Sequence, residues 1–372
     1  MSEPVELYVH IPFCAKKCAY CDFYSHPADE AQMDAYIEEV LEEISLSPFA
    51  GREASSVFFG GGTPSIVKSS HIVTVLEKLR QAFRIREDAE ISIEVNPGTV
   101  TREKLRTFRK AGISRLSVGL QSADDAMLKK LGRIHTFRDF QETYRMAREE
   151  GFKNISADMI LGLPGETPEG FADSLEKVLI MGPEHLSVYS LIIEENTPFY
   201  ALYGPSGAFR HELPSEDKER ETAHLADRLL ESAGYVKYEI SNYAKPGYEC
   251  RHNEGYWTGV PYLGFGAAAA SYIEGKRFKN ALNDEYLALP YEECEVLGEK
   301  DLMSEMMILG LRLTAGVSES AFRARFGKGM EDVYGDVIEK YVSLGALSRD
   351  GAYLKLTPYG MDAANVVMAD FL

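Results

Sequence analysis

Three cysteines near the start of the chain are the residues best suited to do chemistry. Cys14, Cys18 and Cys21 follow a short apolar run and are spaced C-x3-C-x2-C. Three thiolates within one short loop favour a metal site, and a four-iron cluster normally takes four cysteine ligands. Because no fourth cysteine stands nearby in the sequence, such a cluster would keep one iron open for a non-protein ligand, and reactivity would be located there.

Two other uses of these cysteines remain open. His10 or His26 could complete a structural Cys3His zinc site, although zinc sites usually pair one C-x2-C unit with a distant second pair. A disulfide with one spare thiol is less favoured, because the chain has only five cysteines, an odd number, and no secretory leader precedes them. We therefore expect a reducing, cytoplasmic location.

Composition restricts the class of protein. A chain of 372 residues is long enough for two or three domains and for the core of an α/β enzyme. Its formal net charge of -18 argues against sequence-independent binding of nucleic acid, which needs clustered Lys and Arg. No stretch approaches the roughly 18 consecutive apolar residues of a membrane-spanning helix. We expect a soluble protein without a transmembrane segment.

The elements that must position the cysteines alternate regularly between two types. Short β-branched or aromatic runs are each followed by an amphipathic helical pattern, which predicts six β/α units, a parallel sheet and a partial (β/α)6 barrel of the TIM type. The expected strands are Glu6–Pro12, Ser56–Gly60, Ile91–Val95, Arg115–Leu120, Ile155–Leu161 and His185–Ile192. The expected helices are Glu30–Leu46, Ser70–Phe83, Arg102–Ala111, Phe137–Glu150 and Pro168–Met181.

Polar and glycine-rich residues stand where these strands end, which is where the sites of such barrels gather. Gly60-Gly61-Gly62-Thr63-Pro64 could expose backbone groups to an amino acid ligand, or could be only a tight turn. Glu94 inside an apolar strand suits an ammonium or a ribose, or a salt bridge to a core arginine. Gln121, Arg133 and Asp158 could bind ribose hydroxyls and a carboxylate, or form surface pairs. We expect them at one common mouth.

Taken together, these motifs resemble the radical S-adenosylmethionine (SAM) superfamily over about the first 200 residues. The resemblance is carried by the cysteine loop, the Gly-Gly-Gly-Thr-Pro run, Glu94 and the segment Ile160–Gly165. It implies that the three cysteines bind three irons of a [4Fe-4S] cluster and that the open iron takes the amino and carboxylate groups of SAM. Such proteins cleave SAM reductively to a 5′-deoxyadenosyl radical, and the radical chemistry belongs to the cofactor.

A narrower resemblance is to the oxygen-independent coproporphyrinogen III oxidase-like family. It rests on the segments Tyr8–Cys14, Phe59–Ser65, Glu94–Pro97, Ser117–Ser122 and Asp158–Pro164. By that resemblance Tyr8, Gly61 and Glu94 contact the SAM on the cluster. Contacts to a second SAM are implied for Tyr20, Gly62, Thr63, Gln121, Arg133 and Asp158.

Two branches of this family differ in function. The oxidase branch decarboxylates two propionates of coproporphyrinogen III, whereas the HemW branch is regarded as a haem chaperone for respiratory proteins. The oxidase loop has a further cysteine two positions after the third cluster ligand, where this chain has Phe23, and the oxidase has a longer N-terminal extension. The segment His252–Trp257 also matches the H-N-x-x-Y-W motif of the HemW branch. We therefore expect the chaperone function, with the oxidase as the alternative.

His252 is the candidate haem residue. A neutral imidazole is a common axial ligand of haem iron, and Tyr256 and Trp257 supply flat apolar faces for a porphyrin. The alternative is that His252 only forms hydrogen bonds in a packed aromatic turn. Cys250 could approach the same iron or be a small buried apolar residue.

The remaining sequence predicts an accessory region and a C-terminal unit. We expect a barrel over residues 1–205, a linking region over 206–298 with a helix at Pro214–Gly234 and a strand at Tyr238–Tyr243, and a winged-helix-like α+β domain over 299–372. Asp350-Gly351 is the expected turn of its hairpin. Without a basic run, this unit is interpreted as a partner or lid module. Haem and respiratory haem proteins are the expected partners, and the family is compatible with a homodimer.

Overall fold

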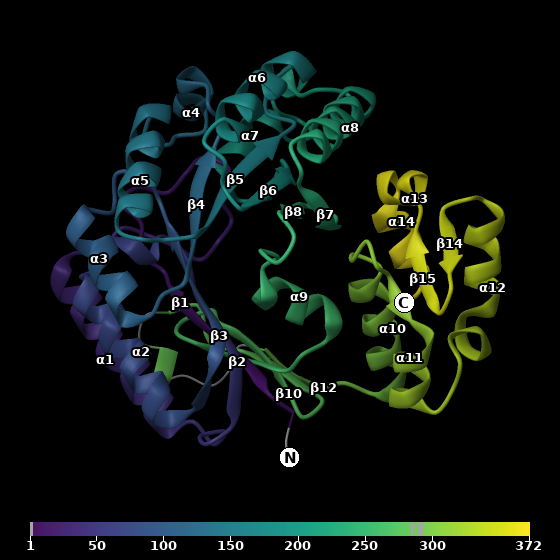
Figure 1. Cartoon of the computed structure of the whole chain (residues 1–372), viewed down its shortest axis with the longest axis horizontal. Coiled ribbons are helices and arrows are strands. Elements are labelled where there is room, and N and C mark those ends of the chain that lie inside the picture. Colours follow the sequence, from purple (N-terminus) through teal and green to yellow (C-terminus); the bar gives the residue numbers. More distant parts are fainter. Residues whose placement is uncertain (1–2, 284–285, 289–292) are drawn as a thin grey trace.

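Six parallel strands form the centre of the molecule. The computed structural model describes residues 3–283, 286–288 and 293–372. Each of the six strands pairs in parallel with the next in chain order, as the alternating pattern predicts. The predicted parallel α/β architecture is therefore confirmed (Figure 1). The six strands are β1 Val5–Ile11, β2 Glu53–Gly61, β3 Arg84–Val95, β4 Arg115–Gln121, β5 Asn154–Leu161 and β6 His185–Ser190.

The same sheet continues at both edges. Among the described residues its strand order is β12-β11-β10-β9-β1-β2-β3-β4-β5-β6-β8-β7, and β9 runs parallel to β1 whereas β8 runs antiparallel to β6. The sequence pattern missed most of these short strands. The single strand expected at Tyr238–Tyr243 is a hairpin instead, because the chain reverses between β7 and β8. The added strands are β7 Val236–Glu239, β8 Asn242–Ala244, β9 Tyr262–Phe265, β10 Ala270–Ile273, β11 Lys276–Lys279 and β12 Glu293–Val296.

Helices cover the convex side of the sheet, and one large apolar core lies between the two layers. The five expected helices are present within about two residues of the predicted ends, since their caps are encoded locally: Asp29 forms a capping box at α1, and Gly112 with φ of 99° ends α3. Two short helices, α4 and α7, were not anticipated. The helices are α1 Glu30–Leu46, α2 Ser69–Ala82, α3 Arg102–Ala111, α4 Asp125–Lys130, α5 Phe137–Glu149, α6 Pro168–Leu179, α7 Pro198–Tyr203 and α8 Glu216–Ser232. Single 3-10 turns are η1 Pro64–Ile66, η2 Arg210–Glu212 and η3 Tyr286–Ala288.

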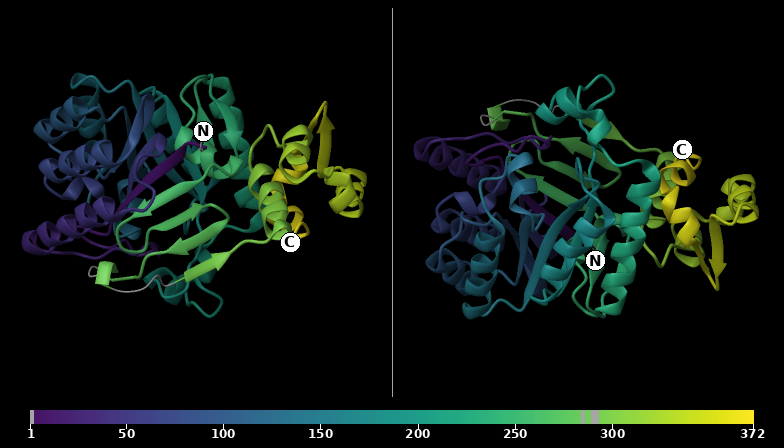
Figure 2. Two further views of the ribbon diagram at one scale, coloured as in Figure 1. Left: turned by 90° about the horizontal axis from the view of Figure 1, so that it is seen from below. Right: turned by 90° about the horizontal axis from the view of Figure 1, so that it is seen from above.

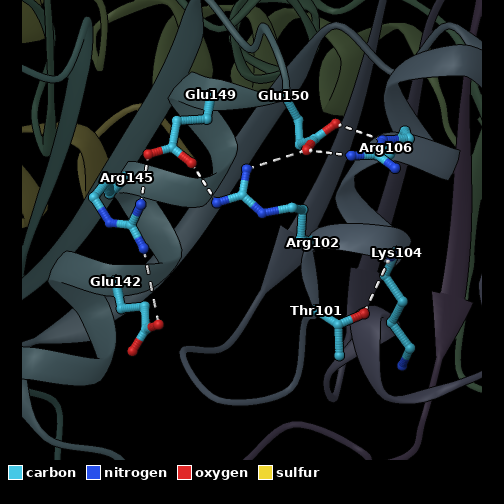
Figure 3. A network of polar contacts seen from close by, with 8 residues as sticks. All are labelled: Thr101, Arg102, Lys104, Arg106, Glu142, Arg145, Glu149 and Glu150. Atoms are coloured by element: carbon cyan, nitrogen blue, oxygen red, sulfur yellow. Dashed lines mark hydrogen bonds and ion pairs between the residues drawn. The ribbon is translucent and has the colours of Figure 1, made fainter.

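Ion pairs join neighbouring helices on this outer side. Figure 3 shows Arg102 and Arg106 of α3 paired with carboxylates of α5 and of its C-terminal residue Glu150. The Nε of Arg106 lies 3.0 Å from Glu150 Oε2. Exposed pairs of this kind contribute little stability individually, so they fix the relative position of the helices rather than supply the main stabilisation.

A further helix, α9 (Arg251–Thr258), lies on the concave side of the sheet (Figure 1). The expected aromatic turn around His252 is thus a helix, which ends at Gly259 with φ of 74°. Gly255 allows its close approach to β1, because a Cβ at this position would stand 2.1 Å from Glu6 Oε1. The inner face of the sheet is therefore partly covered by residues far away in the sequence.

The C-terminal residues form a unit with its own apolar core. The expected hairpin with its turn at Asp350-Gly351 is present, and it pairs with a third strand in the order β13-β15-β14. All three views place this unit at one end of the molecule (Figures 1 and 2), and its helix α10 contacts α9. Its elements are α10 Glu299–Gly310, β13 Val317–Ser318, α11 Glu319–Phe326, α12 Met330–Ser343, β14 Leu347–Asp350, β15 Tyr353–Leu356, α13 Pro358–Asp362 and α14 Ala364–Ala369.

Backbone hydrogen bonds and side-chain contacts join this unit to the sheet. Ile240 N–H donates to Arg312 O at 3.1 Å, and Thr314 N–H donates to Tyr238 O at 3.0 Å. Arg312 follows α10; its guanidinium stacks on the ring of Trp257 at 4.2 Å from the centroid and lies 3.5 Å from the buried carboxylate of Glu239. Within the described residues, no helix is long and apolar enough to cross a bilayer. The division of the chain at residues 205 and 298 stays a prediction, and residues 1–2, 284–285 and 289–292 of the first two expected regions lie outside the described part.

The packing of α9 against β1 leads to a stability prediction. Gly255→Ala should lower the free energy of unfolding by about 2 kcal/mol, because the new methyl group overlaps the buried Glu6 carboxylate. Chemical denaturation of the full chain measures this change. Gly335→Ala is the matched control, since its Cβ would meet no atom within 4 Å in helix α12; it should be neutral or slightly stabilising. Equal effects of the two substitutions would contradict the packing argument.

Candidate functional site

A single cavity opens at the carboxyl ends of the parallel strands. Its volume is about 620 Å³, and its wall includes both the cysteine loop and α9. Every site residue singled out in the sequence lines it, although these residues come from eight separate segments of the chain. They are Tyr8, Cys14, Cys18, Tyr20, Cys21, Gly61, Gly62, Thr63, Glu94, Gln121, Arg133, Asp158 and His252. The common mouth expected from the strand ends is therefore present.

The cysteine loop is held by backbone hydrogen bonds rather than by regular structure. Cys14 N–H donates to His26 O at 3.0 Å, and Cys21 N–H donates to Cys18 O at 3.3 Å. Two of the thiols contact other predicted site residues: Cys14 Sγ lies 3.5 Å from Thr63 Oγ1, and Arg133 Nη1 lies 3.5 Å from Cys18 Sγ. The loop thus faces the strand ends with its sulfur atoms.

The donor set fits an iron–sulfur cluster with an open position. The three thiols are free and only partly buried, and soft thiolates are the ligands that such clusters take. A cluster takes one cysteine on each of three irons, so the three thiols need not meet at one point; in the part of the chain that the structure describes, no three His, Cys, Asp or Glu side chains are close enough to hold one metal ion. Gly62 leaves room beside the loop, because a Cβ there would stand 3.0 Å from Cys14 Sγ and 2.8 Å from Phe13 O.

Glu94 and the first glycines form the wall next to this loop. Gly61 N–H donates to Glu94 Oε2 at 3.1 Å, and Gly61 itself has φ of 117°. A Cβ at residue 61 would stand 2.7 Å from the ring of His10, which in turn hydrogen-bonds Tyr8 at 3.1 Å. Burial, followed by the nearby charge of Asp158, raises the pKa of Glu94 to about 8. At neutral pH this side chain is therefore mainly a neutral acid. It could bind a cationic or hydrogen-bonding ligand.

Arg133 organises the side of the cavity formed by β3 and β4. Its Nη2 donates to Asn96 Oδ1 at 2.5 Å and to Gly119 O at 2.6 Å, in addition to its contact with Cys18. Gln121 ends β4 in a left-handed conformation with φ of 73°, which is uncommon for a residue with a side chain and is typical of functional sites. The surface-pair interpretation of Arg133 is wrong, because its partners are in the cavity wall.

Asp158 and Tyr20 complete the predicted set. Ser117 Oγ donates to both carboxylate oxygens of Asp158 at 3.0 and 2.9 Å, and burial raises the pKa of this carboxyl group. Tyr20 packs edge-on against Phe199 with 6.2 Å between ring centroids. Burial likewise raises the pKa of Tyr20, so its hydroxyl group is neutral at physiological pH.

His252 also lines the cavity and is enclosed by neighbouring side chains. Its Nδ1 lies 2.8 Å from Ser56 Oγ and its Nε2 lies 3.1 Å from Tyr256 Oη, while its ring stacks on Phe58 at 5.1 Å. Burial lowers its pKa to about 3, and burial raises the pKa of neighbouring Glu6 to about 9. Both side chains are therefore uncharged at pH 7. An iron ion could reach Nε2 only after the Tyr256 hydroxyl group moves away.

Two residues of the site carried no assignment from the sequence. Asn96 bridges the two halves of the wall, because its Nδ2 donates to Thr63 Oγ1 at 2.6 Å while its Oδ1 accepts from Arg133. Its position at the end of β3, two residues after Glu94, could have identified it in the sequence as a site residue. Arg115 also lines the cavity, and the alternation of inward residues along β4 with Ser117 and Gly119 could have identified it.

Cys250 and Cys294 lie away from the cluster loop. Cys250 is completely buried and donates to Glu90 Oε1 at 3.5 Å, which agrees with a small buried residue, and it does not line the cavity. Cys294 is exposed on β12. Neither thiol belongs to the group around Cys14.

Comparisons with known proteins agree with this geometry. Residues 8–178 match the Radical SAM superfamily, and residues 297–362 match the HemN C-terminal domain. The heme chaperone HemW of Bacillus subtilis (strain 168) is 34% identical over 98% of this chain and 98% of its own length. The heme chaperone HemW of Escherichia coli (strain K12) is 32% identical over 99% of this chain and 98% of its own.

A solved structure is similar over nearly the whole chain. It is that of coproporphyrinogen III oxidase (HemN) from Escherichia coli, described as a radical SAM enzyme. The TM-score is 0.84 at 25% sequence identity, and the match covers 99% of this chain and 90% of the other. The similarity therefore includes the C-terminal unit as well as the barrel.

The raised pKa of Glu94 predicts a pH effect on stability. Since the folded pKa of about 8 exceeds the ordinary value of 4.5, the associated stability is complete below pH 4.5 and is lost as pH rises through 8. Between pH 6.5 and 8.5 the wild type should lose unfolding free energy as Glu94 ionises. Glu94→Gln should lose roughly 1–2 kcal/mol less over the same interval, a range that includes a discount for solvent contact. Denaturation at both pH values tests this. Glu87→Gln, on the exposed part of β3, is the control and should behave like the wild type.

Proposed function

The chain belongs to the radical SAM superfamily and, within its coproporphyrinogen III oxidase-like family, to the HemW group, and from this membership we propose that it is a haem chaperone. In this proposal it binds a [4Fe-4S] cluster, SAM and haem, and it transfers haem to respiratory haem proteins of the membrane. The observation that supports it best is the single cavity in which three free thiols, the predicted SAM contacts and His252 come together.

The residues have distinct parts in this proposal. Cys14, Cys18 and Cys21 would hold the cluster, which supplies electrons for SAM cleavage when SAM is bound. Neutral Glu94 and the exposed backbone of Gly61 would receive the polar groups of SAM beside the cluster. Asp158, held by two serine hydroxyl groups, would receive ribose hydroxyls of a second SAM together with Gln121. The aromatic wall would exclude water from the enclosed ligands.

The loop itself favours the chaperone over the oxidase. Phe23, which stands where the oxidase branch has another cysteine, is 69% exposed and lines the cavity mouth. An apolar ring at this position offers contact area to a flat apolar cargo but no thiol chemistry. The oxidase remains the second candidate. The whole chain has the same fold as coproporphyrinogen III oxidase, with a TM-score of 0.84.

Other parts of the proposal rest on the family resemblance or on the sequence. Respiratory haem proteins as recipients, a second SAM and a homodimer are predictions from the family, and the cytoplasmic location is a prediction from the cysteine content. The acidic charge of -18 supports the expectation that nucleic acid is not a partner. The C-terminal unit, attached through Arg312, is the proposed module for contacting the recipient.

Cluster assembly and the two activities can be measured together. After anaerobic reconstitution, the wild-type chain should contain close to four iron atoms, bind haem stoichiometrically and show no turnover of coproporphyrinogen III. Changing Cys14, Cys18 and Cys21 to Ala should abolish the cluster absorbance, since three ligands are lost. Cys294→Ala is the matched control and should retain it, because this thiol is exposed and distant from the loop in sequence. Release of protoporphyrinogen by the wild type would favour the oxidase instead.

The proposed haem role of His252 can be tested against a matched control, His185, in the same chain. His185 is also buried, with Ser156 Oγ at 2.9 Å from Nδ1 and Tyr238 Oη at 2.9 Å from Nε2, but it does not line the cavity. His252→Ala should weaken haem binding at least tenfold and alter the Soret band, because an axial ligand is lost. His185→Ala should leave the spectrum unchanged. If both variants bind haem as the wild type does, His252 has only the structural role.

A further inference from the structure

The floor of the cavity contains a buried arginine without a partner. Arg115 opens strand β4 and is only 2% exposed, yet it lines the cavity together with Ser117 and Gly119 of the same strand. Its Nε has no hydrogen-bond partner, and no hydrogen bond or ion pair links its guanidinium group to another described residue. A guanidinium group that is buried in this way carries a full positive charge toward the cavity.

The nearest acids do not account for this charge. Glu90 accepts hydrogen bonds from Ser92 at 3.3 Å and Cys250 at 3.5 Å, and Asp158 accepts from Ser117 and Ser156. They attract Arg115 only from beyond hydrogen-bonding distance. A buried charge is costly unless it is paired and hydrogen-bonded, and the terminal N–H donors of this side chain remain available for a ligand.

The other cations of the cavity are placed differently. Lys16 is exposed next to the cysteine loop, and Arg133 is engaged by Asn96, Gly119 and Cys18. Arg115 and Gln121 occupy opposite ends of β4, and six residues of strand correspond to roughly 20 Å. An anion bound at Arg115 is therefore far from the mouth, where the cysteine loop would hold SAM.

The surroundings of Arg115 indicate the class of ligand. The same cavity is walled by the rings of Phe58 and Tyr256, which suit a flat apolar body. A guanidinium group binds a carboxylate through two parallel hydrogen bonds. A ligand with an apolar plane and a carboxylate arm satisfies both features.

We propose that Arg115 is a carboxylate-binding residue in the floor of the cavity and that its ligand is a propionate group of haem. This assignment rests on the proposed haem-chaperone function and specifies how the cargo is oriented: one propionate points inward, toward the start of β4. The carboxylate of a second SAM has the same chemistry, so the experiment has to separate the two sources.

Haem and its dimethyl ester provide the test, because esterification removes the carboxylate charge and leaves the ring intact. Each is titrated into the reconstituted full chain and followed by absorbance, and SAM binding is measured by calorimetry. The wild type should bind haem about tenfold or more tightly than the diester. Arg115→Gln should bind haem and diester equally, with the affinity for the diester and for SAM unchanged. Arg106→Gln, on the outer side of α3, is the matched control and should retain the discrimination.

Two results would overturn the assignment. The first is a wild type that binds both compounds equally, which needs no variant and so is independent of whether Arg115→Gln folds. The second is full discrimination retained in Arg115→Gln; if that variant also loses SAM affinity, the carboxylate is that of SAM. Absence of any haem uptake by the wild type would contradict the proposed function itself. Arg115→Lys, which keeps the charge but not the paired donors, should discriminate to an intermediate extent.

Discussion

The parallel pairing of β1 to β6 is the constraint on which the rest of the structure depends. Because each strand pairs in parallel with the next, all six carboxyl ends reach one edge and the loops that follow them share one cavity. Side chains alternate along each strand, so Glu94, Ser117 and Asp158 face inward while their neighbours fill the core. A shift of one residue in any strand would point its site side chain toward the helices instead of toward the cavity.

Burial then determines the charge state of the site. Glu6 and Glu94 have raised pKa values of about 9 and 8, and His252 has a lowered value of about 3, so these groups are uncharged at pH 7. The cavity thereby avoids the cost of isolated charges. The arginines differ, since a guanidinium group does not lose its proton: Arg133 is hydrogen-bonded in the cavity wall, and Arg115 is buried without such a partner. The cavity therefore combines an aromatic wall, neutral hydrogen-bonding groups and a buried cation without a hydrogen-bond partner, a combination suited to an amphipathic anion.

The covering helix connects the site to the C-terminal unit. Helix α9 carries His252 toward the cavity and Trp257 toward Arg312, and Tyr256 hydrogen-bonds His252 between them. Arg312 and His252 therefore both contact residues of the same helix, one on the side of the C-terminal unit and one on the side of the cavity.

Local signals in the sequence determined the cysteine loop, the six parallel strands, five helices and the strand-end residues, since spacing, periodicity and caps such as Asp29 and Gly112 act within a few residues. The strands β7 to β12, the helical state of His252 and the burial of Arg115 were decided only by tertiary structure. Short edge strands have too few residues for a period, and α9 is held by Glu6, some 250 positions earlier. Whether a polar side chain is paired or left free in a cavity depends on such distant neighbours, which no local pattern contains.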